Sequence, residues 1–175
     1  MIRSRLFWTV AVLGVVLDLV SKVWIFSNLG EYERQAVIEG FFTLARVENR
    51  GGVWGIGQNL TIGFAIVRFA ALFVILYLLK ATRDPSRAFL VGLGLIFGGA
   101  VGNLWDTVVH GHVRDFLEFN LGFMVWPTFN VADSCITVGA FLLFFHFFFL
   151  GGDEVGDGSK EHADIDSRVP EETGS

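Results

Sequence analysis

The sequence has little cysteine and little charge. Its single cysteine, Cys135, excludes an internal disulfide bond and any metal site built from several thiolates. Charged residues make up only 18% of the 175 residues, and no basic stripe follows the chain. This pattern argues against nucleic acid as a partner.

The composition is dominated by apolar side chains. Hydrophobic residues account for 53% of the chain and aromatic residues for 15%, with 19 phenylalanines and five tryptophans. A compact water-soluble domain of this length needs far less apolar surface for its core. The composition therefore indicates a protein whose solvent is a lipid bilayer.

The net charge is −5, and the charges are unevenly distributed along the chain. Residues 152–175 contain eight acidic and two basic side chains, whereas residues 1–151 contain ten acidic and eleven basic ones. We therefore predict two regions, a transmembrane domain over residues 1–151 and an acidic, disordered cytoplasmic tail over residues 152–175.

Four apolar runs are each about 20 residues long, enough to cross roughly 30 Å of hydrocarbon as a helix. The first run follows two arginines, a pattern also found in cleavable signal peptides. Asp18 and Lys22 interrupt it, however, and no small-residue cleavage site follows, so an uncleaved helix is favoured. The predicted spans are about 6–26, 61–79, 88–105 and 131–150.

Basic residues set the predicted orientation. They lie before the first span and in the short loop around Pro85, which places both termini in the cytoplasm. Segments 27–60 and 106–130 then face outward. Within the first of these, the short apolar runs of residues 37–56 predict a small β-like flap on the membrane surface. The expected fold class is an all-α membrane protein with four transmembrane helices and this extracytoplasmic flap.

Ionisable side chains inside a span cost a few kcal/mol or more, so each one needs a reason. Asp18 and Lys22 lie four residues apart on one helical face, where an ion pair would support a site near the outer surface. Arg68 in the second span has no assigned role. The third span carries Gly94 and Gly98 in a small-residue spacing, which favours close helix packing over a nucleotide loop.

Two aspartates flank the outward segment between the third and fourth spans. If Asp115 and Asp133 approach within a few Å, charge repulsion makes them share one proton. One carboxylate then activates water as a base, and the other protonates the leaving group.

Two alternatives stay open on spacing alone. In the first, Asp133 caps the fourth helix and Asp115 pairs with Arg114. In the second, a metal ion is bound by side chains of the same outward segment. The candidate ligands are His110, His112, Asp106 and Asp115.

Four sequence motifs, in order and in register with the four spans, resemble those of the lipoprotein signal peptidases (signal peptidase II), a family of bacterial membrane aspartic peptidases. The resemblance covers about residues 10–150. The motifs are Asp18-Leu-Val-Ser-Lys22, Asn49-Arg-Gly-Gly-Val-Trp-Gly, Gly98-Gly-Ala-Val-Gly-Asn103-Leu-Trp-Asp106 with Gly111-His-Val-Arg-Asp115-Phe116, and Phe129-Asn130-Val-Ala-Asp133-Ser134-Cys-Ile136.

The resemblance implies that Asp115 and Asp133 are the catalytic pair, with no metal or cofactor. It also implies a set of polar helpers that orient the substrate backbone or hold the two aspartates. These supporting residues are Asp18, Lys22, Asn49, Asn103 and Asn130.

The implied substrate is a prolipoprotein whose cysteine carries a diacylglyceryl group, cut on the N-terminal side of that cysteine. The implied place is the bacterial inner membrane, with the active site at its extracytoplasmic face. Membrane lipid is then a further partner, nucleic acid is not, and a monomer is expected.

The chain departs from the family pattern at two places. The family usually has arginine directly after the aspartate at Asp106, whereas this chain has Thr107. Two alternatives follow: substrate handling differs, or Arg114 or Arg50 substitutes for the missing cation. Residues 52–54 also differ from the commoner flap sequence. The alternative function is therefore a catalytically impaired relative, or a four-helix scaffold that binds lipidated precursors without cutting them. A small transporter, the third hypothesis, would place its polar residues at mid-membrane depth.

Overall fold

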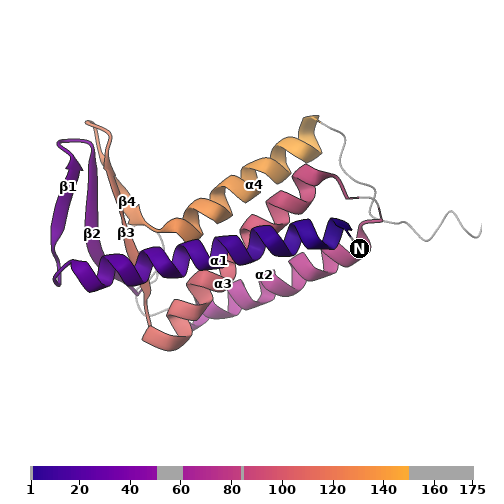
Figure 1. The fold of residues 1–175 in the computed structure, drawn as a ribbon, viewed down its shortest axis with the longest axis horizontal. Coiled ribbons are helices and arrows are strands. Elements are labelled where there is room, and N and C mark those ends of the chain that lie inside the picture. Colours follow the sequence, from indigo (N-terminus) through magenta and orange to yellow (C-terminus); the bar gives the residue numbers. More distant parts are fainter. Residues whose placement is uncertain (1, 51–60, 84, 150–175) are drawn as a thin grey trace, which may run out of the picture.

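The computed structural model describes residues 2–50, 61–83 and 85–149 (Figure 1). Four of its helices are long and apolar enough to cross a membrane, which confirms the predicted fold class. The elements, in chain order, are α1 (Ile2–Asn28), β1 (Arg34–Ile38), β2 (Phe42–Asn49), α2 (Thr61–Ala81), α3 (Arg87–His110), β3 (Val113–Asn120), β4 (Val125–Phe129) and α4 (Val131–Phe149).

Helix α3 is the centre of the bundle and packs against the three other helices. Its glycines allow the close approach, as predicted from their spacing. A methyl group at Gly98 would lie only 2.6 Å from the backbone oxygen of Ala11 in α1, and one at Gly99 would meet the backbone of Ala132 in α4. Because small residues let helix backbones meet, α1 and α4 both lie directly against α3.

The four strands form one antiparallel sheet in the order β1-β2-β3-β4, and the sheet stands at one end of the bundle (Figure 1). The central pair joins distant parts of the sequence, since Val47 of β2 lies opposite Asp115 of β3. Gly111 makes the transition from α3 to β3, because its φ of 74° is a conformation that glycine adopts easily. The sheet therefore holds Asp115 beside the helix ends.

The structure differs from the sequence expectations in two details. Helix α3 continues to His110 rather than ending near residue 105. The outward segment 106–130, expected as a loop, contains strands β3 and β4. The expected flap also belongs to this sheet through β1 and β2, although residues 51–56 lie outside the described part. The tail 152–175 lies outside it as well, and the division into two regions stays a prediction.

Candidate active site

Asn130 links the two candidate catalytic aspartates. It is fully buried between β4 and α4, and its Nδ2 donates a hydrogen bond of 2.6 Å to Oδ1 of Asp115. Its Oδ1 accepts the backbone N–H of Asp133 at 2.9 Å. A single amide side chain thus holds the β3 aspartate against the first turn of α4.

Each aspartate has a further amide partner. Asn49 of β2 donates to Oδ2 of Asp115 at 2.9 Å, and Asn103 of α3 donates to Oδ1 of Asp133 at 2.8 Å. Asp115 is buried and Asp133 is half-buried. Both carboxyl groups are therefore fixed by neutral donors in a poorly solvated place, where their orientation is determined before any substrate arrives.

Burial, and after it the negative charge of Asp133, raise the pKa of Asp115 to about 7. The hydrogen bonds from Asn49 and Asn130 oppose this rise, because they favour the ionised carboxylate. Asp115 therefore carries a proton in a large fraction of molecules near neutral pH. The negative charge of Asp133 is close enough to Asp115 to contribute to this shift.

Asp133 also caps its helix, so this alternative and the dyad are not exclusive. Asn130 and Asp133 form a reciprocal box in which Oδ2 of Asp133 accepts the backbone N–H of Asn130 at 3.3 Å. The pairing expected for Asp115 in that alternative is wrong. Arg114 instead donates to Asp106, with Nη2 at 2.7 Å from Oδ1.

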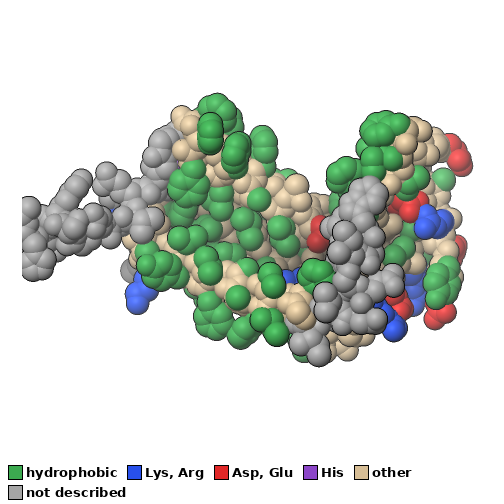
Figure 2. Space-filling view, turned by 180° about the vertical axis from the view of Figure 1, so that it is seen from behind, with side chains coloured by type: hydrophobic (Ala, Val, Ile, Leu, Met, Phe, Trp, Pro, Cys, Tyr) green, Lys and Arg blue, Asp and Glu red, His purple; other side chains and the backbone are tan. Residues whose placement is uncertain are grey.

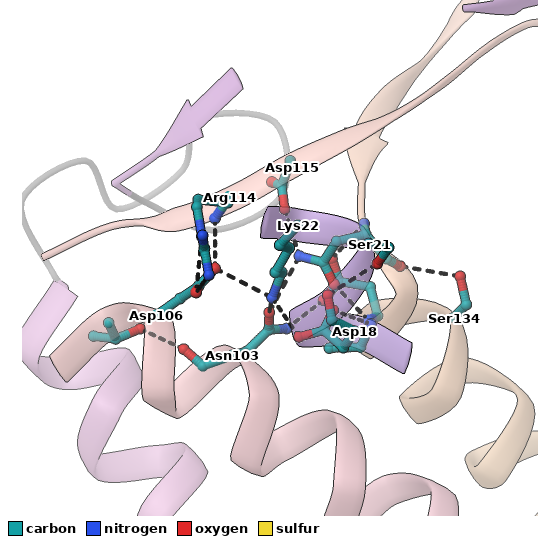
Figure 3. Close-up of polar contacts among 12 residues, drawn as sticks. Asp18, Ser21, Lys22, Asn103, Asp106, Arg114, Asp115 and Ser134 are labelled. Carbon is teal, nitrogen blue, oxygen red and sulfur yellow. Dashed lines mark hydrogen bonds and ion pairs between the residues drawn. The ribbon is translucent and has the colours of Figure 1, made fainter. Parts of the chain in front are cut away.

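A cluster of buried charges lies below Asp115 in the view of Figure 3. The ammonium of Lys22 donates to Asp18 at 2.7 Å and to Asn103 at 3.0 Å, and it lies 3.2 Å from Asp106. With Arg114, the cluster has two positive and two negative groups. Such pairing makes the burial of four charges tolerable.

Asp18 also acts on α4, because its Oδ1 accepts the backbone N–H of Ala132 at 2.9 Å. The structure thus brings every predicted site residue into one continuous hydrogen-bond network. These residues are Asp18, Lys22, Asn49, Asn103, Asp115, Asn130 and Asp133.

The candidate metal ligands do not converge. Within residues 2–50, 61–83 and 85–149, no group of three or more His, Cys, Asp or Glu side chains is placed to hold a metal ion. The ring centroids of His110 and His112 are 6.0 Å apart, and His112 lies 3.7 Å from Glu48. Asp106 is directed instead to Lys22 and Arg114.

Arg68, for which the sequence predicted no role, contacts Thr107, the residue at which this chain departs from the family motif. Nη1 of Arg68 in α2 donates to Oγ1 of Thr107 at 3.1 Å. The two expected substitutes are directed elsewhere, since Arg114 binds Asp106 and Arg50 lies 3.8 Å from Glu48. In the sequence, Arg68 stands out as a single charged residue inside an otherwise apolar run, which is the feature that could have pointed to a role.

The surface agrees with a membrane enzyme whose site lies at one end. Hydrophobic side chains cover the bundle, while acidic and basic side chains gather mainly at the sheet end, next to a hollow between sheet and helices (Figure 2). Asp115 and Asp133, which are joined through Asn130, lie at that end.

Comparisons with known proteins identify the family of this chain. A family described as signal peptidase (SPase) II matches residues 10–149. A protein named lipoprotein signal peptidase from Symbiobacterium thermophilum is 40% identical over 136 residues, covering 78% of this chain and 90% of that protein. Another with this name, from Maridesulfovibrio salexigens, is 36% identical over 144 residues, covering 79% and 92%.

Two solved structures share the fold. Both are described as bacterial membrane enzymes, and both superpose with a TM-score of 0.71. The first is 27% identical and covers 95% of this chain and 93% of its own, and the second is 30% identical and covers 81% and 91%. With a family match over most of its length, this chain belongs to the signal peptidase II family and is a bacterial, multi-pass membrane peptidase.

Proposed function

We propose that the protein is an aspartic endopeptidase that removes the signal peptide from diacylglyceryl-modified prolipoproteins, cutting on the N-terminal side of the lipidated cysteine. Family membership supports the coarser part, cleavage of lipoprotein signal peptides. The link through Asn130 between Asp115 and Asp133 carries the rest, because it holds two carboxyl groups in one network.

The proposed reaction needs one proton on the pair. The ionised carboxylate takes a proton from water, whose oxygen attacks the scissile carbonyl carbon to form a tetrahedral intermediate. The protonated carboxyl group then gives its proton to the leaving amine as the carbon–nitrogen bond breaks. Because burial favours the neutral form of Asp115, we assign the proton of the resting enzyme to Asp115 and the role of base to Asp133.

The membrane supplies much of the positioning in this proposal. The acyl chains of the substrate stay in the bilayer, anchored by about 0.8 kcal/mol for each buried CH₂ group, and the signal helix lies against the bundle. The scissile bond is thereby held at one membrane face, where the sheet and the helix ends meet (Figure 1). We place this face outside the cytoplasmic membrane and both termini inside, following the positive-inside pattern. The proposal includes a monomer without a cofactor.

The proposal is tested with Asp115→Asn and Asp133→Asn in a gel-shift assay on a lipidated precursor. Both variants keep the side-chain shape but lose the ability to exchange a proton, so we expect no detectable cleavage from protein that inserts normally. Glu31→Gln, at an exposed position before β1, is the matched control and should cleave like the parent. Full activity of either Asn variant would refute the dyad, and a parent protein that binds precursor without cutting it would identify the scaffold alternative.

A further inference from the structure

Arg68 is a charged side chain in the apolar helix α2, where an unpaired cation is costly. It is half-buried rather than extended to the lipid, and its guanidinium donates to Thr107 of α3 at 3.1 Å. Among the described residues this hydroxyl is its hydrogen-bond acceptor, and the guanidinium also lies over the ring of Phe64, 6.0 Å from its centroid. Most of the five N–H donors of this planar group therefore have no acceptor among the described residues. Helix α2 thus places next to α3 a cation with one hydrogen-bond acceptor among the described residues.

The charge of Arg68 acts on the candidate active site. It interacts electrostatically with Asp133 of α4, Asp115 of β3 and Asp106 of α3. Asp106 is already compensated by Lys22 and by Arg114. The two site aspartates have neutral amide donors as their direct partners.

An open groove adjoins this cation. It has a volume of about 590 Å³, lies between α2 and α3, and has almost entirely apolar walls. Thr107 both lines the groove and holds the guanidinium. A chain lying in this groove therefore passes beside Arg68. The residues that line it are Ala65, Ile66, Phe69, Leu104, Thr107, Val108 and Gly111.

We propose that Arg68, oriented by Thr107, is a positioning residue that donates a hydrogen bond to a backbone carbonyl oxygen of the substrate next to the scissile bond. Peptide carbonyls are the acceptors that a substrate lying along an apolar groove brings to this point, and a guanidinium is the donor group suited to bind them. The inference rests on the proposed function and adds a residue that reaches the substrate from α2.

The charge has a second effect that makes the proposal testable. A cation near the pair favours the ionised carboxylate, so Arg68 keeps one carboxyl group ionised at lower pH than the pair alone would. The charged groups facing this region are Asp106 and Lys22 from the other helices, and both stay in place in the variants below.

The experiment measures KM, kcat and the pH profile of cleavage of a lipidated precursor in mixed micelles for Arg68→Gln, Arg68→Lys, Thr107→Val and Thr107→Ser. Lys80→Gln, which removes an exposed cation from the far end of the same helix, is the matched control and should behave like the parent. For Arg68→Gln we expect KM to rise about tenfold, the size of one charge-assisted hydrogen bond. We also expect the acidic limb of the profile to move up by roughly one pH unit.

Arg68→Lys keeps the charge but not the planar fork, so it should raise KM and leave the acidic limb in place. Thr107→Val should raise KM, but less than Arg68→Gln does. Thr107→Ser keeps the hydroxyl and should raise KM less than Thr107→Val. A lower Tm for Arg68→Gln with parental KM and a parental acidic limb would mean that Arg68 only joins α2 to α3, which would overturn the proposal. Asp115→Asn in the same assay keeps the two ideas separate, because its activity tests the dyad whatever Arg68 does.

Discussion

The side-chain amide of Asn130 lies 2.6 Å from the carboxylate of Asp115, and both groups are buried. Asn130 lies between the end of β4 and the start of α4, so the contact links both elements to β3. Its side chain also accepts the backbone N–H of Asp133 in the first turn of α4. The orientation of Asp115 is therefore set by the same residue that starts the helix carrying Asp133.

Asn130→Ala should reduce kcat by roughly 100-fold, because a displacement of about 1 Å between reacting groups has an effect of that size. The variant loses the donor to Asp115 and the acceptor for the backbone of Asp133. Single-turnover cleavage measures the change, with Asn28→Ala, at an exposed position, as control. A parental kcat for Asn130→Ala would show that the bridge does not position the pair.

Cleavage should decline on the alkaline side with an apparent pKa near 7. Burial and Asp133 raise the pKa of Asp115 to about 7, so the proton assigned to the leaving group is lost as pH rises through this value. The profile of kcat/KM between pH 5 and pH 9, which reports groups of the free enzyme, checks this. A rate that stays constant up to pH 9 would contradict the assignment of the acid to Asp115.

The thermal stability of the protein should also depend on the protonation of Asp115. Folding favours the protonated form of a carboxyl whose pKa is raised, so its contribution is present below the ordinary pKa and is lost as pH rises through about 7. The Tm of the parent should therefore fall between about pH 4 and pH 7, and that of Asp115→Asn should fall less. Equal slopes for the two proteins would remove Asp115 as the cause.

Gly102→Ala should destabilise the protein even though alanine favours helices by about 1 kcal/mol over glycine. A methyl group at Gly102 would collide with the carboxylate of Asp18, displacing it from Lys22 and from the N-terminus of α4. We expect a net loss of about 1–3 kcal/mol, typical of overpacking, measured by thermal unfolding in detergent. Val109→Ala on the exposed side of α3 is the control, and a Gly102→Ala variant as stable as that control would argue against the close contact.

Lys22→Met should cost roughly 3–5 kcal/mol, because it leaves the buried carboxylate of Asp18 without its ion pair. Adding Asp18→Asn removes that charge and keeps an oxygen for the backbone N–H of Ala132. The double variant should therefore be more stable than Lys22→Met alone, and a double-mutant cycle on Tm measures the coupling. Additive effects would mean that the two side chains are independent.

The main features of the fold could be predicted from apolar run length, since a helix of about 20 residues crosses the hydrocarbon with its backbone hydrogen bonds satisfied internally. The end of α3 could not, because Asp106 and Thr107 look like solvent-exposed residues while both are buried by partners from β3 and α2. The pairing of β2 with β3 is similarly hidden, because α2 and α3 separate the two strands in sequence.

The site residues were accessible to sequence reasoning to different degrees. Asp18 and Lys22 are conspicuous as charges in an apolar run, and their contact is the one that i, i+4 spacing predicts. Spacing alone left Asp115 and Asp133 open between a dyad, caps and a metal site, and only the family resemblance favoured the dyad. Arg68 was visible but not interpretable, because its partner Thr107 lies on another helix.

The order of elements along the chain has a consequence for biosynthesis. Strand β2 finds its partner β3 only after two more helices have been made, and Asp115 finds Asn130 only at the start of α4. A growing polypeptide on the ribosome therefore lacks the paired carboxyl groups until its final helix has been translated.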